Sequence, residues 1–582
     1  MPSGAISERF PPLHAPPAVR FSPGDAEHSK VAARMTPTSG RPSVPTEARF
    51  TDPGAESDLS ICTLRESAGA SVALSRYARS GGSIRRRSIV LAVLLAAGVF
   101  TSLWRLEAAS WNFDELAYRK AGLQYAHGDY KYNLEHPFLG KQLIGISMAL
   151  LGDTRLGARL PAALLTLGTG LILLSLGTWL DGFGTGLTTA ATWWLLPRAP
   201  GVLEANIGRY ALLEPVTLFF EAAALALAWS WVRTGRAWVA AAAGAAVGLA
   251  ASSKLTGLLV LPAVLLAVGS TPRSWRVRLA QASVLALAMA VGFLGPYLAA
   301  GPAGLSAIGH AFKYQAIHAT RGHLQFIAGH ASLRPPWWSG FWWQTQYLGV
   351  AGTVALWAAS LTGLMSTWRT RPRVAVFVTA SFAVPVAAVC MAPLQLPHYH
   401  LAFSVGQALA AGLGLAAAWR QITRRPSSWR SGAALAVIVT LALVALGSMR
   451  AIATLRPGDY RAAAQFLRVH GLDRSAVLVL GYPEVMSAEL PGAPIVNAPR
   501  SMRAFDRSWR QYDVLVIDSF IAKRYTRSAA DGDVHRLAST YEEYRFDRLT
   551  VYVRTTATSP QVSATCTVGA TAPSRQAQCA RK

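Results

Sequence analysis

Charged residues are scarce in this chain of 582 residues. Asp, Glu, Lys and Arg make up only 15% of the sequence, whereas hydrophobic residues make up 52%. A soluble domain usually carries about 25% charged residues. Because the hydrophobic residues also gather in long runs, the scarcity of charge excludes an ordinary soluble protein and predicts one that lies in a lipid bilayer.

Cysteine is rare as well. None of the four cysteines belongs to a CxxC pair or to a Cys/His cluster with zinc-site spacing. Cys566 and Cys579 could form a disulfide if the C-terminal tail is extracytoplasmic, and two free thiols are the alternative. The net charge is +26, but the basic residues lie between apolar runs and in the tails. Stacking aromatics do not alternate with them, so no nucleic-acid partner is expected.

Eleven apolar segments, each close to the ~20 residues that cross the hydrocarbon of a bilayer, are predicted as transmembrane helices. An arginine triplet at 85–87 precedes the first of them, which places the N-terminus in the cytoplasm. The eleven segments are residues 88–106, 155–178, 183–199, 209–232, 237–252, 255–270, 279–300, 343–366, 374–392, 400–418 and 431–449.

The loops between these segments differ in charge. Counted from a cytoplasmic N-terminus, the inner loops are residues 181–185, 233–236, 271–278, 367–373 and 420–430, and all but the first are rich in arginine. This asymmetry follows the positive-inside rule. It places residues 107–154, 301–342, 393–399 and everything after 450 outside. The two long outer loops are expected to hold amphipathic segments that lie on the membrane.

The composition changes at both ends of the chain. Residues 1–85 predict a disordered, basic cytoplasmic tail, and residues 556–582 predict a second disordered tail. Residues 455–555 predict a small α/β domain, with a helix at 460–470 and strands at 476–480, 512–517, 541–546 and 549–553. The predicted fold class is a multi-span α-helical membrane protein, with residues 86–450 as the transmembrane domain and an extracytoplasmic α/β domain after it.

The first outer loop carries two adjacent acids, Asp114 and Glu115, just beyond the first apolar segment. Such a pair can supply a general base that takes a proton from an acceptor hydroxyl, although an isolated pair is more often a solvated loop feature. Further along, His136 and Lys141 belong to a string in which a prolyl turn leads into a helix. A lysine near the lipid headgroups can hold a phosphate or simply extend to the interface.

Two later groups contain charges at the predicted outer ends of apolar segments. Arg209 can bind a phosphate with its planar fork. Glu214 and Glu221 are acids inside apolar sequence, where a carboxylate needs a partner or a proton. Lys254 lies at the outer turn between two segments.

The last candidate group is the string His398, Tyr399 and His400, at the outer end of a late segment. All the candidate groups fall at the same predicted face of the membrane. Carboxylates and cations gathered there suit a lipid-linked phosphate, whose charge must be stabilised as it leaves, and an acceptor hydroxyl, which must lose its proton.

Four strings in this set resemble those of the protein O-mannosyltransferases and their bacterial relatives, which are polyprenyl-phosphate-sugar-dependent glycosyltransferases with the GT-C fold. The strings are FDELAY at 113–118, HPFLGK at 136–141, RYALLEP at 209–215 and GLAASSKLTG at 248–257. Each string alone is weakly specific, but four in family order on a matching topology form a strong signal. The resemblance covers roughly residues 88–450 and implies a GT-C-like fold.

The resemblance also implies roles for individual residues. Asp114 would be the catalytic base, and Glu115 would be its partner in the acidic motif. Lys141 and Arg209 would contact the donor phosphate, and Lys254, in the matching SSK string, is grouped with them.

Other positions match the family less closely. Glu214 stands where the family usually has Asp, and His136 matches only as part of its string. The segment 398–400 matches a late motif loosely, so these residues are kept as further active-site candidates. Eukaryotic members carry a β-trefoil in a later outer loop, but residues 301–342 are too short for one. This chain has the C-terminal domain instead, which leaves the acceptor open.

The activity implied is an inverting transfer of mannose or another hexose from a polyprenyl-phosphate donor to a hydroxyl outside the plasma (inner) membrane. The acceptor could be a protein, a lipid or a cell-wall glycan. A transporter is the alternative from another class, but its polar sites usually lie at the bilayer midplane and within repeats. No cofactor is certain, and a divalent metal ion bound by the carboxylates is left open.

Overall fold

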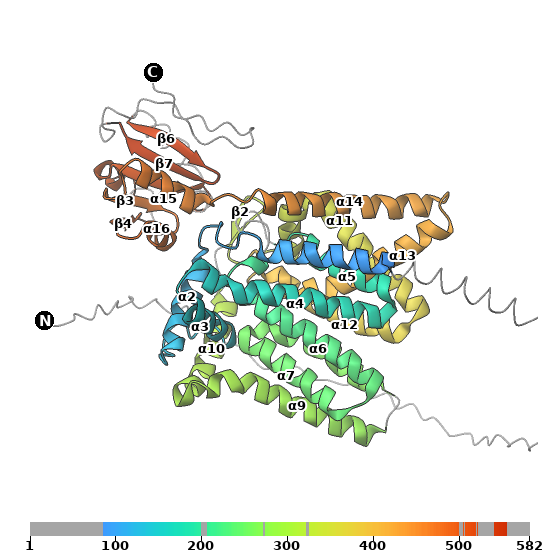
Figure 1. The fold of residues 1–582 in the computed structure, drawn as a ribbon. Helices are drawn as coiled ribbons and strands as arrows, with labels where there is room; N and C mark the ends of the chain where they lie inside the picture. The colour runs from blue at the N-terminus through green and yellow to red at the C-terminus, as the bar shows by residue number, and fades with distance from the viewer. Residues whose placement is uncertain are drawn as a thin grey trace, which may run out of the picture. The chain divides into compact units, whose positions relative to one another are not determined.

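The computed structural model describes residues 85–198, 207–271, 274–321, 325–499, 505, 507–519, 521 and 540–555. Both predicted tails lie outside the described residues, except for residue 85. Cys566 and Cys579, predicted to form a disulfide or to be free thiols, lie outside them as well. The described part of the chain contains a bundle of long helices and then a smaller domain of helices and strands (Figure 1).

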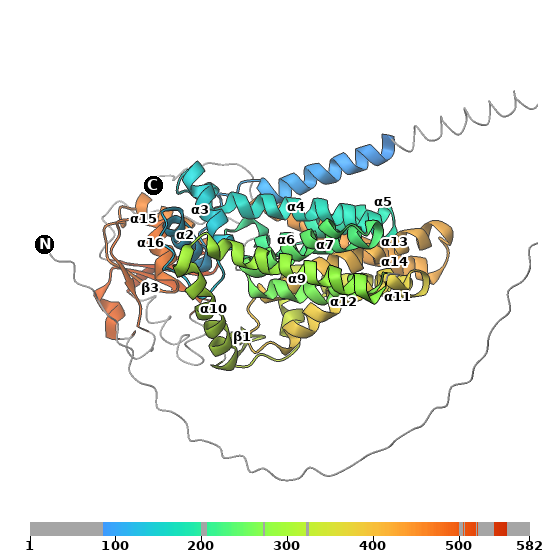
Figure 2. The same cartoon turned by 90° about the horizontal axis from the view of Figure 1, so that it is seen from below.

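Helices account for most of the chain between residues 85 and 453, and each predicted span coincides with a helical segment. The long helices run in much the same direction in both views (Figures 1 and 2). In chain order, the α-helices of this part of the chain, long and short, are Arg85–Leu103, α2 (Phe113–Ala126), α3 (Leu139–Leu151), α4 (Arg155–Asp181), α5 (Phe183–Leu195), α6 (Glu214–Thr234), α7 (Ala237–Ser253), α8 (Leu261–Gly269), α9 (Trp275–Leu298), α10 (Gly301–Arg321), α11 (Ser339–Thr370), α12 (Pro372–Met391), α13 (Ser404–Arg424) and α14 (Trp429–Ala453).

Eight of the helices in the described residues are long and apolar enough to cross a membrane. Three of the predicted spans are shorter: α5 has 13 residues, α7 has 17, and the third is the segment Leu255–Gly269. The multi-span helical class is confirmed, whereas the predicted number of eleven spans is not.

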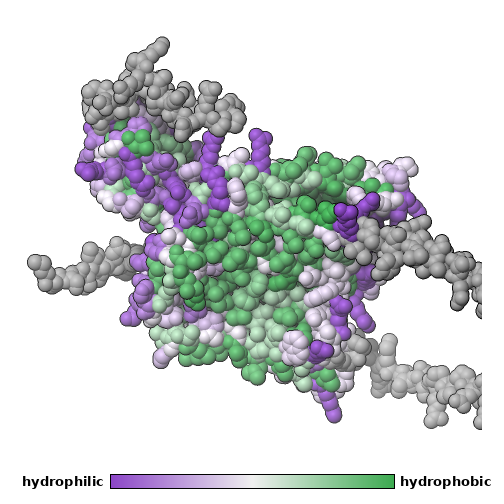
Figure 3. Space-filling view, viewed as in Figure 1, coloured by the Kyte–Doolittle hydropathy of each residue, from purple (hydrophilic) through white to green (hydrophobic). Residues whose placement is uncertain are grey.

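The surface of the bundle is largely apolar. In Figure 3, hydrophobic residues cover the helices, and hydrophilic residues gather on the C-terminal domain and at the far end of the bundle. Large apolar side chains such as Leu287 on α9 and Leu443 on α14 are exposed. Apolar surface of this extent is stable only when lipid covers it.

Glycines allow some helices to approach each other closely. A Cβ atom on Gly145 of α3 would lie 2.1 Å from the carbonyl oxygen of Gly122 on α2. A Cβ atom on Gly244 of α7 would lie 2.1 Å from the carbonyl oxygen of Leu285 on α9. Small residues at such contacts are a common basis of helix association in membranes. The first contact also fixes α2, the helix that carries Asp114.

Three of the predicted inner loops meet at one end of the bundle. Asp181, at the end of α4, pairs with Arg371 at 2.8 Å and with Arg420 at 2.9 Å. Helices α2, α3 and α10, from the two long outer loops, lie at the other end in both views (Figures 1 and 2). The fold therefore separates the arginine-rich loops from the predicted outer loops, as the proposed topology requires.

The C-terminal domain has a five-stranded sheet in the order β4-β3-β5-β7-β6. Its central strands are β3 (Val477–Leu480) and β5 (Val514–Asp518), which pair in parallel and are completely buried. The other elements are α15 (Asp459–Val469), α16 (Pro483–Glu489), β4 (Ile495–Asn497), β6 (Tyr541–Phe546) and β7 (Leu549–Arg554). The predicted α/β fold is confirmed, and its last two predicted strands form the antiparallel pair β6–β7. Strand β4 and helix α16 were not predicted, because both are too short to show a hydrophobic period.

Candidate active site

A cavity of about 410 Å³ lies at the end of the bundle that carries α2 and α10. Its walls come from the helix bundle, from the segment before α13 and from the C-terminal domain. Five of the ten residues singled out from the sequence line it: Asp114, His136, Lys254, His398 and Tyr399. These residues belong to four separate stretches of the chain, and the fold brings them together. The sequence predicted this, because it placed all the candidate groups at one face of the membrane.

Asp114 lies in the first turn of α2, which Asn112 caps. The Asn112 side chain accepts a hydrogen bond from the Asp114 N–H at 2.9 Å, and Glu115 accepts one from the Asn112 N–H. This capping box fixes the start of the helix. The Asp114 carboxylate borders the cavity and has no hydrogen bond or ion pair with any described residue. Burial and the charge of Glu214 raise its pKa to about 6, although Lys254 acts in the opposite direction.

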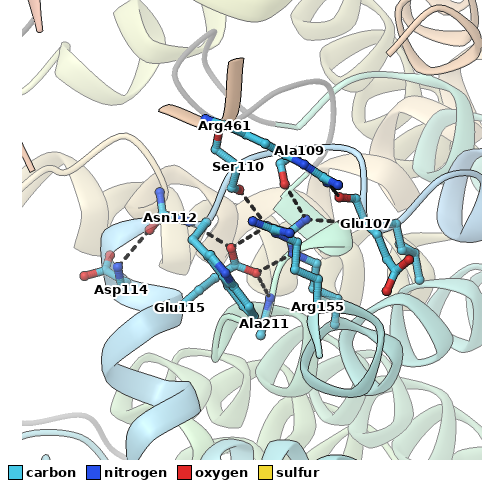
Figure 4. Close-up of polar contacts among 12 residues, drawn as sticks. Glu107, Ala109, Ser110, Asn112, Asp114, Glu115, Arg155, Ala211 and Arg461 are labelled. Carbon is cyan, nitrogen blue, oxygen red and sulfur yellow. Dashed lines mark hydrogen bonds and ion pairs between the residues drawn. The ribbon is translucent and has the colours of Figure 1, made fainter. Parts of the chain in front are cut away.

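Glu115 points into the protein, away from the cavity. Its carboxylate accepts two hydrogen bonds from Arg159, both at 2.8 Å. It also accepts one from the Ala211 N–H at 2.7 Å (Figure 4). Glu115 and Arg159 are both fully buried. In Figure 4 the side chain of Asp114 points away from this cluster. The placement suits a residue that positions α2, and the predicted catalytic role of Glu115 stays a prediction.

Lys254 follows the last residue of α7 and forms an ion pair with Glu214, the first residue of α6. The Nε2 atom of His398 lies 3.6 Å from the same Glu214 oxygen. The Lys254 ammonium also lies 4.4 Å from the centre of the Tyr399 ring. Glu214 therefore holds a cation and an imidazole at the cavity wall. The acid inside apolar sequence is paired, as expected for a charge at this depth.

His136 contacts the cavity in its neutral form. Burial, helped by the nearby Lys254 charge, lowers its pKa to about 3. Its ring packs edge-on against Tyr118, with the ring centres 5.8 Å apart. A neutral imidazole can donate or accept a hydrogen bond, but it cannot supply positive charge to a phosphate.

Besides Glu115, three more predicted site residues lie away from the cavity. The Lys141 ammonium is completely buried and donates to the backbone carbonyls of Asn133 and His136. Arg209 donates to the carbonyl of Thr101 at 3.1 Å and to that of Trp104. Nε2 of His400 lies 2.7 Å from the Tyr347 hydroxyl. Their predicted roles at the donor or the active site stay predictions, and these contacts favour structural roles.

Several cavity residues were not found from the sequence. Tyr314 and His318 come from α10, and Asp459, Tyr482 and Arg548 come from the C-terminal domain. None of them belongs to a recognisable string, and in the sequence they look like ordinary polar surface residues. Arg159, which pairs with Glu115, could have been found from the sequence. It is an arginine inside a predicted span, where a charge usually has a structural or functional partner.

Two further expectations concern acids and metals. The Oε1 atom of Glu221 is buried and has no hydrogen-bond partner among the described residues, so the expected partner is not seen at this oxygen, and protonation stays a prediction. The described residues contain no group of three or more His, Cys, Asp or Glu side chains that could hold a metal ion. Dependence on a divalent metal stays open.

Part of this chain matches a known protein family, and most of its fold matches solved structures. Residues 152–291 match the family model described as dolichyl-phosphate-mannose-protein mannosyltransferase. The matched stretch includes Arg209, Glu214 and Lys254. Comparison with curated protein sequences gives no match.

Solved structures share the fold over most of the chain. ArnT from Cupriavidus metallidurans in the apo state is 17% identical, with a TM-score of 0.50 over 82% of this chain and 98% of that one. The same enzyme bound to undecaprenyl phosphate is 15% identical, with a TM-score of 0.50 over 80% of this chain and 97% of that one. The apo oligosaccharyltransferase of Archaeoglobus fulgidus is 12% identical, with a TM-score of 0.50 over 81% and 75%.

At these identities the structural matches show the fold alone, and the family model matches residues 152–291 of the chain. Together they define the chain as a membrane glycosyltransferase with the GT-C fold. Within that class, it is similar to the dolichyl-phosphate-mannose-protein mannosyltransferases. The predicted resemblance to this class is confirmed, and the matched stretch contains two of the four strings, those at 209–215 and 248–257.

Proposed function

We propose that this protein transfers mannose or another hexose from a polyprenyl-phosphate donor to an acceptor hydroxyl at the extracytoplasmic face of the membrane. One observation carries the proposal: the carboxylate of Asp114, which no described residue pairs with, and the cation of Lys254 line the same cavity. These two groups are the base and the phosphate-binding charge that such a transfer needs.

In the proposed reaction, the acceptor oxygen attacks the anomeric carbon of the sugar while Asp114 accepts the hydroxyl proton. The bond between that carbon and the phosphate oxygen breaks on the opposite face, which inverts the configuration. The leaving phosphate remains on its lipid, and Lys254, held by its ion pair with Glu214, stabilises the charge that develops. With a pKa of about 6, Asp114 is mostly ionised at neutral pH and still basic enough to accept the proton.

The donor class is supported by the similar proteins. One ArnT structure contains undecaprenyl phosphate, and the matched family model is named for dolichyl-phosphate-mannose. The exposed apolar surface of the bundle would let a polyprenyl chain remain in the bilayer while its phosphate reaches the cavity. Lys141 and Arg209 are given no phosphate contact in this mechanism, because neither side chain lines the cavity.

The membrane orientation is part of the proposal. The arginine-rich loops that meet around Asp181 would face the cytoplasm together with the N-terminus. The cavity and the C-terminal domain would then lie outside the plasma or inner membrane.

A transfer assay on membranes that contain the protein tests this proposal. The membranes are incubated with radiolabelled polyprenyl-phosphate mannose, polyprenyl-phosphate glucose or a nucleotide sugar, and protein, lipid and glycan products are separated. We expect label to move only from a lipid-phosphate donor. Label that moves only from the nucleotide sugar would contradict the proposed donor class.

A further inference from the structure

The C-terminal domain forms part of the wall of the same cavity that Asp114 lines. Asp459 from the start of α15, Tyr482 and Val485 from the start of α16, and Arg548 from the β6–β7 turn all border it. Nothing in the proposed donor chemistry uses these side chains. They therefore need a separate explanation.

The domain is held firmly against the loop that leads to Asp114. Glu489 of α16 accepts the Trp111 N–H at 2.9 Å and forms an ion pair with Arg155 of α4. The Arg461 N–H donates to Ser110 at 3.2 Å, and the Arg461 guanidinium donates to the carbonyl of Glu107. These contacts involve residues 107–111, immediately before α2. The wall made by the C-terminal domain is consequently fixed relative to the base.

The polar part of this wall is the ion pair of Arg548 with Asp459, in which one hydrogen-bond donor of Arg548 is not used by the described residues. Nε of Arg548 lies 2.6 Å from Asp459 and 3.5 Å from Asp518. The Nη1 atom of Arg548 is buried and has no hydrogen-bond partner among the residues that the structure describes. An unpaired buried donor of this kind is costly unless a ligand binds it. The pair also offers donors and acceptors side by side, which is the pattern that neighbouring hydroxyls on a sugar ring require.

An aromatic surface lies next to the charged pair. Phe113 directly precedes Asp114, and its ring centre is 5.5 Å from that of Tyr482. Phe113 is 44% exposed, which is unusual for a phenylalanine outside the lipid-facing surface. An exposed ring beside a few convergent polar groups suits a ligand with one apolar and one hydroxylated face.

We propose that Arg548, Asp459, Phe113 and Tyr482 form the acceptor subsite of the transferase, and that the acceptor is the pyranose ring of a glycan. This inference rests on the proposed transfer reaction. In it, Arg548 and Asp459 bind the ring hydroxyls, and the two aromatic rings contact its C–H face. One remaining hydroxyl is then directed at the Asp114 carboxylate.

A peptide acceptor fits this wall less well. Extended peptides are commonly bound by pairing with the edge of a sheet. The edge strands here are β4 and β6, yet the described cavity residues of the C-terminal domain come from helix starts and a turn. The wall therefore presents side chains rather than a free strand edge.

The test compares Arg548→Lys with a matched control, Arg545→Lys, in the full-length protein. Lysine at 548 keeps the charge and the pairing with Asp459 but lacks the planar fork. Arg545 lies on the same hairpin, and its side chain is 79% exposed. Two properties are measured: the KM for methyl hexopyranosides in transfer from radiolabelled polyprenyl-phosphate mannose, and binding of the same glycosides by saturation-transfer NMR. A peptide that contains Ser and Thr serves as the competing acceptor.

We expect Arg548→Lys to raise the glycoside KM about tenfold, as the loss of a charged hydrogen bond would, and to leave the donor KM unchanged. Arg545→Lys should leave both unchanged. Equal glycoside KM and equal glycoside binding in the two variants would overturn the subsite, and so would preferential use of the peptide. Glycoside binding that depends on Arg548 without any sugar transfer would support the subsite while contradicting the proposed reaction.

Discussion

The carboxylate of Glu115 lies in a doubly hydrogen-bonded ion pair with Arg159, and both side chains are completely buried. Its neighbour Asp114 borders the cavity instead. Successive residues of an α-helix are about 100° apart around its axis, so two adjacent acids cannot share one environment. The first turn of α2 therefore uses one acid to fix its position and leaves the other for chemistry.

Replacing Glu115 should destabilise the fold. Glu115→Ala leaves Arg159 as a buried charge without its partner, which typically costs about 3–5 kcal/mol. We expect a lower unfolding temperature in detergent or nanodiscs. Asp153→Ala is the control, because the Arg119–Asp153 pair is partly exposed and should contribute at most about 1 kcal/mol. Equal unfolding temperatures for the two variants would contradict this assignment.

Replacing Lys141 should lower stability, whereas replacing Lys254 should raise the donor KM. Lys141→Met removes the donor to two backbone carbonyls, so it should lower stability and leave the donor KM of the folded protein unchanged. Lys254 is best tested as Lys254→Met with Glu214→Gln, which removes both charges of the ion pair. That double variant should raise the donor KM by about tenfold or more. A donor KM that rises only for Lys141→Met would instead support the role first predicted for Lys141.

The contact made by Glu489 should keep the C-terminal domain in place. Glu489→Ala removes both the ion pair with Arg155 and the acceptor for the Trp111 N–H. We expect faster cleavage by a protease between α14 and α15, together with reduced transfer. Glu484→Ala, an exposed position on the same helix, should behave like the unmodified protein. Unchanged proteolysis in Glu489→Ala would show that other contacts hold the domain.

Much of the fold could be predicted from hydrophobicity alone. The apolar runs coincide with helices because a bilayer requires each spanning segment to satisfy its own backbone hydrogen bonds. The number of spans could not be fixed in this way. Helices such as α5 and α7 are short, and glycine contacts with neighbouring helices, which the sequence does not reveal, position α7.

The candidate site could be predicted only in part. Asp114, Lys254 and His398 stand at predicted outer ends of spans, and topology was sufficient to group them. Whether an ionic side chain faces the cavity or the interior depends on distant partners, as Glu115 depends on Arg159. Arg548 could not be placed at all, because only the packing of the C-terminal domain brings it to the cavity.

The pH dependence of transfer should follow the ionisation of Asp114. Burial raises its pKa from 3.8 to about 6, and only the ionised form can accept a proton. The value of kcat/KM should therefore be constant above pH 7 and fall about tenfold per pH unit below pH 6. His136, with a pKa of about 3, does not titrate in this range. Burial also raises the pKa of Asp459 in the cavity wall to about 6, so its ionisation can only steepen the fall. A profile that is flat between pH 5 and pH 8 would contradict the assignment.

The same pKa predicts the effect of Asp114 on stability. A carboxyl group whose pKa is raised on folding binds its proton more tightly in the folded state. Its ionisation therefore destabilises the folded protein as the pH rises from 3.8 to about 6. At pH 7, Asp114→Asn should consequently unfold at the same temperature as the unmodified protein or at a higher one.

The most direct test of the account is the turnover of Asp114→Asn with a labelled polyprenyl-phosphate sugar. Asparagine keeps the size of the side chain and the capped first turn of α2 but cannot accept the proton. We expect kcat to fall by about 10²–10⁴, the usual contribution of a general base, in a protein that inserts, folds and binds donor normally. Turnover close to that of the unmodified protein would contradict the assignment of Asp114 as the base.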